Sequence, residues 1–152
     1  MLQYSAYLYD QDLDSYNVEL PFLVHSCGKI SMNCGRNLNI DRRNGRRDFQ
    51  IIYIHQGKGH FFLNNHEVVL NEGCTIIYQP LEIQQYSFRY LENAQFYWLH
   101  FSGNDIPNLL GEAGLDRQII NTGMASYIPA LFEGIIRELS MKQTGYLQIT
   151  NL

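Results

Sequence analysis

Residues 45–65 read GRRDFQIIYIHQGKGHFFLNN and indicate two β-strands joined by a glycine turn. The run before Gly57 is rich in Ile, Tyr and Phe, which are typical of strands, and a second apolar run follows the turn. Asn64 and Asn65 both tolerate the left-handed backbone that a two-residue hairpin requires, so a third strand is expected directly after them. This stretch therefore predicts an antiparallel sheet.

Short apolar runs continue on both sides of this stretch, separated by segments rich in Asn, Gly and Pro. Residues 1–20 are interpreted as an irregular, tyrosine-rich arm, and residues 33–45 as a loop. Several short strands at this spacing predict a mainly β fold, a β-sandwich or barrel. The strands are expected at 22–31, 47–55, 58–63, 66–70, 74–79, 83–90 and 95–102.

The pattern changes to helical spacing after Gly103. Residues 104–115, NDIPNLLGEAGL, predict a short helix. A longer amphipathic helix is expected to begin near Ser126, with Pro129 in its first turn. Residues 145–152, GYLQITNL, are expected to begin another helix. The apolar stripe of the longer helix consists of Ile128, Leu131, Phe132, Ile135, Ile136 and Leu139.

The composition is typical of a globular chain, and its net charge does not favour binding to anionic partners. The chain has 152 residues, of which 45% are hydrophobic and 17% charged, and its formal net charge is −4. A nucleic-acid-binding domain usually carries a basic face, so this chain by itself is not expected to bind DNA. Three cysteines form no disulfide framework, and no stretch approaches the length of about 18 apolar residues that a membrane span needs. A cytoplasmic protein without a membrane segment is expected.

Three segments in order resemble the N-terminal domain of AraC-type transcriptional regulators, which has the cupin or jelly-roll fold. They are the stretch quoted above, LNEGCTIIYQPLEIQQYSF at 70–88 and FYWLHFSG at 96–103. The resemblance covers roughly residues 40–104, and the helical tail is compatible with it. It implies an arm at 1–20, a cupin-like effector-binding domain at 21–104 and a helical dimerisation or linker segment at 105–152. In the family, DNA is bound by a separate domain with two helix-turn-helix units, and no such segment is expected in this chain.

Metal-dependent cupins bind their ion through two histidines, a carboxylate and a later histidine. When the chain is aligned to this pattern by the turns YIHQGKG and EGCTIIYQP, these ligand positions fall on Asn44, Arg46, Gln50 and Gln84. None is a good metal ligand, and Arg46 would repel a cation. A site with no metal and no cofactor is therefore predicted.

The remaining motifs also give little support to catalysis. A metal site built from His25, Cys27 and Cys34 would match no common zinc spacing. The five histidines are interpreted as turn and surface residues plus one or two core residues with hydrogen-bond partners. No nucleophile elbow and no phosphate-binding glycine loop occurs. We therefore expect no enzyme, with a small cupin enzyme such as a sugar isomerase or epimerase as the alternative.

A ligand pocket between the sheets is the site that the resemblance implies. Strand alternation allows either Phe96, Trp98 and His100 or the alternate residues to face it, and the resemblance favours the first set. Arg42, Tyr86, Phe96 and Trp98 fall at positions that contact the effector in sugar-responsive members, so the resemblance implies a sugar or another polar metabolite. Phe96 departs from those members, which have a polar, histidine-type contact at its position. The predicted ligand-binding residues are Arg42, Arg46, Gln50, Gln84, Tyr86, Phe96, Trp98 and His100.

Simpler interpretations stand beside these. The segment DRRNGRR at 41–47 also fits a solvated basic turn, and Trp98 also fits the core. The helical stripe fits either the core of one subunit or the homodimer interface that the resemblance implies. A dimerisation module with a vestigial pocket is the third alternative for the whole chain.

Overall fold

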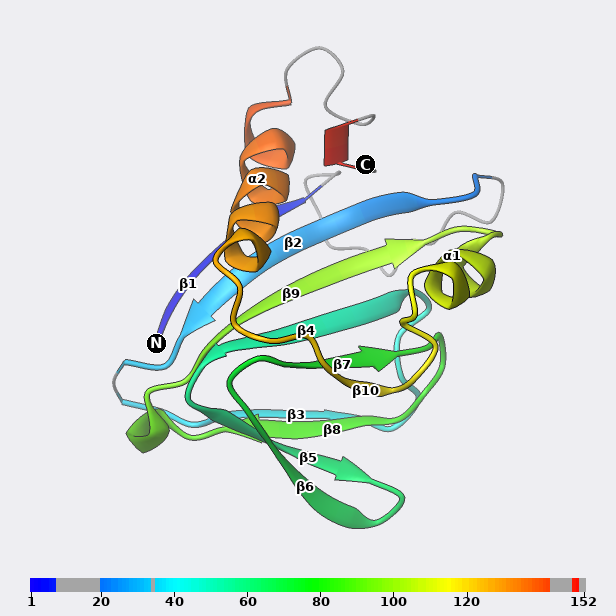
Figure 1. Cartoon of the computed structure of the whole chain (residues 1–152). Helices are drawn as coiled ribbons and strands as arrows, with labels where there is room; N and C mark the ends of the chain where they lie inside the picture. The colour runs from blue at the N-terminus through cyan, green and yellow to red at the C-terminus, as the bar shows by residue number, and fades with distance from the viewer. Residues whose placement is uncertain (8–19, 34, 143–148, 151–152) are drawn as a thin grey trace.

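The computed structural model describes residues 1–7, 20–33, 35–142 and 149–150. Two antiparallel sheets face each other, and helices lie outside the larger one (Figure 1). The predicted fold, a mainly β jelly-roll sandwich followed by helices, is confirmed.

The larger sheet consists of β1 (Leu2–Tyr7), β2 (Leu23–Ser31), β4 (Phe49–Gln56), β7 (Cys74–Tyr78), β9 (Gln95–Ser102) and β10 (Ile119–Asn121). Their order across the sheet is β1-β2-β9-β4-β7-β10. The smaller sheet consists of β3 (Leu38–Arg42), β5 (Lys58–Leu63), β6 (His66–Asn71) and β8 (Gln84–Phe88), in the order β3-β8-β5-β6. Asn64 and Asn65, between β5 and β6, both have positive φ, which confirms the predicted two-residue hairpin.

Strand alternation divides the apolar side chains of the larger sheet between two cores. On β9, Phe96 and Trp98 face the smaller sheet, whereas Tyr97 and Leu99 face the opposite way. The core between the sheets also includes Phe61 and other buried residues of the smaller sheet. Strand alternation alone allowed either set of β9 residues to face the smaller sheet. The structure places Phe96 and Trp98 on that side, which is the set that the family resemblance favours.

The helices cover the outer face of the larger sheet, where the second core lies. They are α1 (Ile106–Glu112) and α2 (Tyr127–Met141), whereas a short 3₁₀ turn (Tyr90–Glu92) connects β8 to β9. α2 lies against β1, β2 and β9 (Figure 1), and its buried Ile136 and Leu139 join that outer core. Pro129 lies in the first turn of α2, as predicted. Of the further helix expected at 145–152, only residues 149–150 are described, and they are helical; the rest lies outside the described residues.

Three strands were missed by the sequence interpretation. Residues 38–42, read as part of a loop, form β3, and residues 2–7, read as an irregular arm, form β1. Both are short edge strands, and neither contains a continuous apolar run like that of β4. Residues 119–121 form the short strand β10 at the other edge of the larger sheet.

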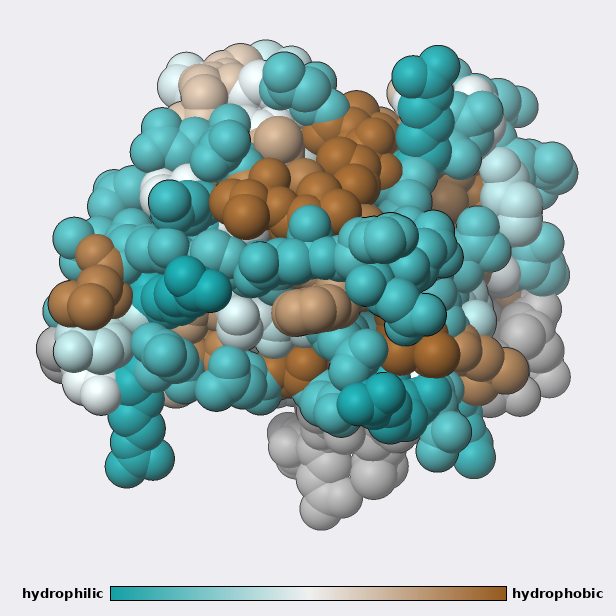
Figure 2. Space-filling model, turned by 90° about the horizontal axis from the view of Figure 1, so that it is seen from below, coloured by the Kyte–Doolittle hydropathy of each residue, from teal (hydrophilic) through white to brown (hydrophobic). Residues whose placement is uncertain are grey.

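The outer surface of the smaller sheet is mostly polar. Figure 2 views the molecule from that side, and hydrophilic residues cover most of the face, with separate hydrophobic patches between them. Phe62 on β5 and Val69 on β6 are among the exposed apolar side chains. No helix in the described part of the chain is long and apolar enough to cross a membrane.

Candidate functional site

A cavity of about 190 Å³ opens between the two sheets, near the edge that β1 and β3 form. Its polar lining consists of Gln3, Arg42, Gln50, Tyr86 and His100. Its apolar and aromatic lining consists of Tyr7, Ile30, Leu38, Ile40, Phe96 and Trp98. The cavity therefore offers both hydrogen-bonding groups and flat apolar surface.

Six of the eight predicted ligand-binding residues line this cavity, although they come from four strands. They are Arg42, Gln50, Tyr86, Phe96, Trp98 and His100. Arg46 and Gln84 are buried but are not among the lining residues. The structure thus brings together most of the residues that the family resemblance assigned to the pocket.

Five lining residues were not predicted, and all lie on β1, β2 or β3. Leu38 and Ile40 belong to β3, where they alternate with Asn39 and Asp41, so period-two alternation was the signal that could have found them. Gln3 and Tyr7 belong to β1, where no comparable apolar alternation exists. Recognising these two residues required the pairing of β1 with β2.

Arg46 and Gln84 have structural partners just behind the cavity wall. Arg46 donates from Nε to Asp48 Oδ1 at 2.7 Å and from Nη2 to Asp48 Oδ2 at 3.1 Å, a bidentate ion pair in which both residues are buried. Gln84 Oε1 accepts a hydrogen bond from Arg42 Nη1 at 2.9 Å. Asp48 therefore offsets the charge of Arg46, and Gln84 orients Arg42.

The environment keeps His100 and Tyr86 neutral. Burial lowers the pKa of His100 well below its usual value, and the positive charges of Arg46 and Arg42 lower it further. Burial also raises the pKa of Tyr86, an effect that Arg42 and a hydrogen bond from Gln50 partly oppose. At neutral pH the cavity therefore contains an uncharged imidazole and an uncharged phenol.

Several buried polar atoms in and beside the cavity have no hydrogen-bond partner among the described residues. They include Gln50 Oε1 and His100 Nε2 on the cavity lining and Gln84 Nε2 and the Tyr78 hydroxyl beside it. The other ring nitrogen of His100 lies 3.0 Å from Ser26 Oγ. A buried polar group without a partner costs about 1–3 kcal/mol, so these atoms mark a place where a bound molecule would add hydrogen bonds.

Trp98 forms an aromatic wall of the cavity. Its indole centroid lies 6.2 Å from the ring of Tyr7 and 4.7 Å from the ring of His100. It lies across Gly28 of the neighbouring strand β2, whose Cα is paired with its own. A flat ligand face could stack against this indole.

The histidines do not form a metal centre in the described part of the chain, where no group of three or more His, Cys, Asp or Glu is arranged to hold an ion. Three of them, His25, His60 and His100, are buried, which is more than the one or two predicted. His60 lies between two carboxylates, with Nδ1 3.1 Å from Glu67 Oε1 and Nε2 2.8 Å from Glu92 Oε2. His60 therefore has a structural environment on the outer face of the smaller sheet.

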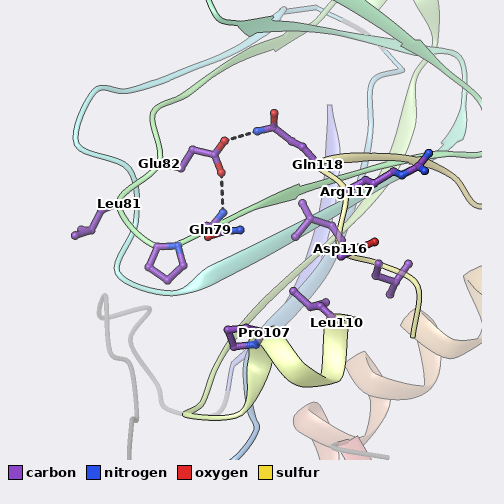
Figure 3. A pocket seen from close by; sticks show the side chains of 11 residues that line it. Gln79, Leu81, Glu82, Pro107, Leu110, Asp116, Arg117 and Gln118 are labelled. Atoms are coloured by element: carbon purple, nitrogen blue, oxygen red, sulfur yellow. Dashed lines mark hydrogen bonds between the residues drawn. The ribbon is translucent and has the colours of Figure 1, made fainter. Parts of the chain in front are cut away.

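A larger cleft of about 550 Å³ lies outside the sandwich, between the β7–β8 loop and α1 (Figure 3). Glu82 lies at its edge and accepts hydrogen bonds from the Gln79 backbone N–H, at 2.8 Å, and from the Gln118 side chain. None of the predicted ligand-binding residues lines this cleft. The larger volume of this cleft does not make it the better candidate for a ligand site, because the buried polar atoms converge at the inner cavity.

The apolar stripe of α2 packs mainly inside the chain. Ile136 and Leu139 are buried, and Ile128, Phe132 and Ile135 pack against the same core. Phe132 stacks on the rings of Tyr53 and Tyr97. Of the predicted interface residues, Leu131 is the one that remains mostly exposed, at 63%.

A family model described as the AraC-like ligand binding domain matches residues 33–148. This match covers well over half of the chain, so the chain belongs to the family of AraC-like ligand binding domains. Family membership indicates a ligand-sensing, regulatory domain.

Among solved structures, the chain is similar to the apo form of a ToxT variant from Vibrio cholerae, with a TM-score of 0.52 and 15% identity. That comparison covers 88% of this chain and 52% of ToxT, so the chain spans about half of the ToxT length. A cupin domain of Cnp3 from Schizosaccharomyces pombe matches with a TM-score of 0.41 and 17% identity, covering 64% of this chain and 67% of that one. At these identities the likeness concerns the fold alone. No curated protein sequence matches the chain.

Proposed function

We propose that this domain binds a small polar effector, a sugar or a related metabolite, in the metal-free cavity between its sheets. The observation that carries the proposal is a pair of buried polar atoms, Gln50 Oε1 and His100 Nε2. They have no partner among the described residues, and they line a cavity with an indole wall. An effector would supply the missing hydrogen bonds and cover Trp98. No catalytic role is proposed for these residues.

In this proposal the effector acts on a DNA-binding domain with helix-turn-helix units, beyond the chain described, in a cytoplasmic homodimer. Gln3 and Tyr7 of β1 line the cavity, so the arm of residues 1–20 would contact the effector. A ligand that binds one arrangement of β1 better than another would shift the population toward it. The regulator would in this way respond to the metabolite.

Ligand-dependent stabilisation tests the proposal directly. A bound effector at a hundredfold excess over its dissociation constant should stabilise the fold by about 2.7 kcal/mol, measured by thermal unfolding with a panel of sugars and sugar derivatives. Gln50→Ala should reduce this stabilisation, and deletion of residues 1–20 should weaken the affinity. Unchanged affinity in both variants would contradict the location of the site.

Dimerisation is proposed through the outer side of α2. Tyr127, Leu131 and Met141 are each more than half exposed there, and a groove of about 290 Å³ beside Gly134 extends to Ile149. Leu131→Glu should shift sedimentation toward the monomer without lowering the melting temperature. Leu109→Glu on α1 is the matched control, and equal sedimentation of both variants would reject this interface.

A further inference from the structure

The charges that line the cavity are unbalanced. Arg42 is the charged residue among the eleven described lining residues, which include no Asp or Glu. The charge of Arg46 does not add to that of Arg42, because Arg46 is not a lining residue and forms an ion pair with Asp48. His100 is neutral because its pKa is lowered, as described above. The described lining therefore carries a net charge of one positive unit.

Among the described residues, Arg42 contacts only neutral groups. It donates from Nη1 to Gln84 Oε1 and forms a hydrogen bond with the Tyr86 side chain. No carboxylate of the described residues lies within ion-pair distance of it, whereas the neighbouring Arg43 pairs with Asp41 at 2.9 Å on the surface. A guanidinium has five N–H donors in a planar fork, so Arg42 retains donors for a further acceptor.

The rest of the lining limits what such an acceptor can be attached to. The indole of Trp98 and the ring of Phe96 offer apolar surface, and Gln50 Oε1 is a buried acceptor that requires a donor such as a hydroxyl. A phosphate would leave negative charge in excess, because no second cation lines the described cavity. The volume of about 190 Å³ is below the range of about 300–1,000 Å³ that is usual for drug-sized ligands, so the molecule must be small.

We propose that the effector is a small hydroxylated monocarboxylate, of the sugar-acid class. Its carboxylate pairs with Arg42, a hydroxyl donates to Gln50 Oε1, and an apolar face of its carbon skeleton lies on Trp98. This inference rests on the proposed function, since it names the ligand of the same cavity.

Matched pairs of a sugar and its acid test the inference. Glucose is compared with glucuronate and galactose with galacturonate, using the fluorescence of Trp98, the single tryptophan of the chain, as the signal. At about pH 7 each acid should bind about tenfold or more tightly than its neutral parent, and added salt should weaken only the binding of the acid.

Variants of two neighbouring arginines separate recognition from stability. Arg42→Gln should lower the affinity for the acid to that for the neutral parent, whereas Arg42→Lys should retain an intermediate affinity. Arg43→Gln, which changes an exposed arginine, should bind as the wild type does. Thermal unfolding confirms that each variant folds.

The outcomes distinguish this inference from the proposed function. Neutral sugars that bind as tightly as their acids, or an Arg42→Gln variant with unchanged affinity for the acid, would overturn the sugar-acid class and keep the cavity as the effector site. No change in fluorescence or melting temperature with any member of the panel at millimolar concentration would overturn both.

Discussion

Gly28 on β2 determines where the indole of Trp98 can lie. A Cβ atom at residue 28 would be 2.5 Å from Trp98 Cζ2 and 2.6 Å from Cε2, much closer than real contacts allow. The backbone of Gly28 is not left-handed, so the requirement for glycine comes from space and not from φ. Because Gly28 has no side chain, the indole of Trp98 can lie over β2 and form the aromatic wall of the cavity.

Replacing Gly28 by alanine should displace Trp98 at a cost of about 1–3 kcal/mol in the free energy of unfolding. Tryptophan fluorescence should change, and the affinity for the effector should fall. Gly111→Ala on α1 is the control, because a Cβ there meets nothing within 4 Å and alanine favours a helix by about 1 kcal/mol over glycine. A Gly28→Ala variant with wild-type fluorescence and affinity would show that the indole is not held in this way.

Two buried tyrosines differ in whether their hydroxyl has a partner. The Tyr53 hydroxyl donates to the Gly123 carbonyl oxygen at 2.9 Å, whereas the Tyr78 hydroxyl has no partner among the described residues. Tyr53→Phe should lower the free energy of unfolding by about 1 kcal/mol, and Tyr78→Phe should leave it unchanged or raise it. Urea unfolding measures both, and a larger loss for Tyr78→Phe would contradict this account.

At the scale of elements, Glu133 connects three of them. Its Oε1 accepts hydrogen bonds from the Tyr97 hydroxyl of β9, at 2.7 Å, and from the Tyr4 hydroxyl of β1. Because β1 and β9 both contribute residues to the cavity, this carboxylate joins the cavity walls to α2. A change in β1 on effector binding would reach α2 by this route.

Glu133→Ala should loosen the attachment of β1 to α2, because both tyrosine hydroxyls lose their acceptor, at a cost of about 1 kcal/mol in this partly exposed position. Hydrogen exchange measured by mass spectrometry should show faster exchange of the β1 amides. Glu138→Ala, one turn further along α2, is the control. Equal exchange in the two variants would mean that β1 is held by its pairing with β2 alone.

At the scale of the whole molecule, the cores contain several tyrosine hydroxyls and one cysteine thiol that are protonated in the folded state. Burial raises the pKa of Tyr53, Tyr78 and Tyr97, and of the Cys27 thiol. Burial, together with Glu133, also raises the pKa of Tyr4, to about 12. Ionisation of these groups therefore opposes folding.

The sign of the pH dependence follows from these raised pKa values. The folded state retains protons that the unfolded state releases above about pH 8.5 for cysteine and about pH 10 for tyrosine, so the stabilising contribution is complete below this range and is lost as the pH rises. The free energy of unfolding should fall between about pH 9 and pH 12, as measured by urea unfolding. Cys27→Ala should move the onset to higher pH, and a stability that is constant over this range would contradict the prediction.

The sequence by itself determined the central strands, the hairpin at Asn64 and Asn65, and the extent of α2. These elements follow from local alternation, turn residues and helical spacing, which need no knowledge of distant contacts. The family resemblance, extended by strand alternation, assigned Gln50 and Tyr86 to the inner faces of their strands, and both line the cavity.

Only the tertiary structure decided which of the two predicted arginines lines the cavity. Arg42 and Arg46 are four residues apart and chemically identical, yet Arg46 pairs with Asp48 behind the wall and Arg42 lines the cavity. The strands β1 and β3, with Gln3, Tyr7 and Ile40, became parts of the site only through pairing with β2 and β8. Edge strands acquire their partners from distant parts of the chain, and the local sequence contains no record of that pairing.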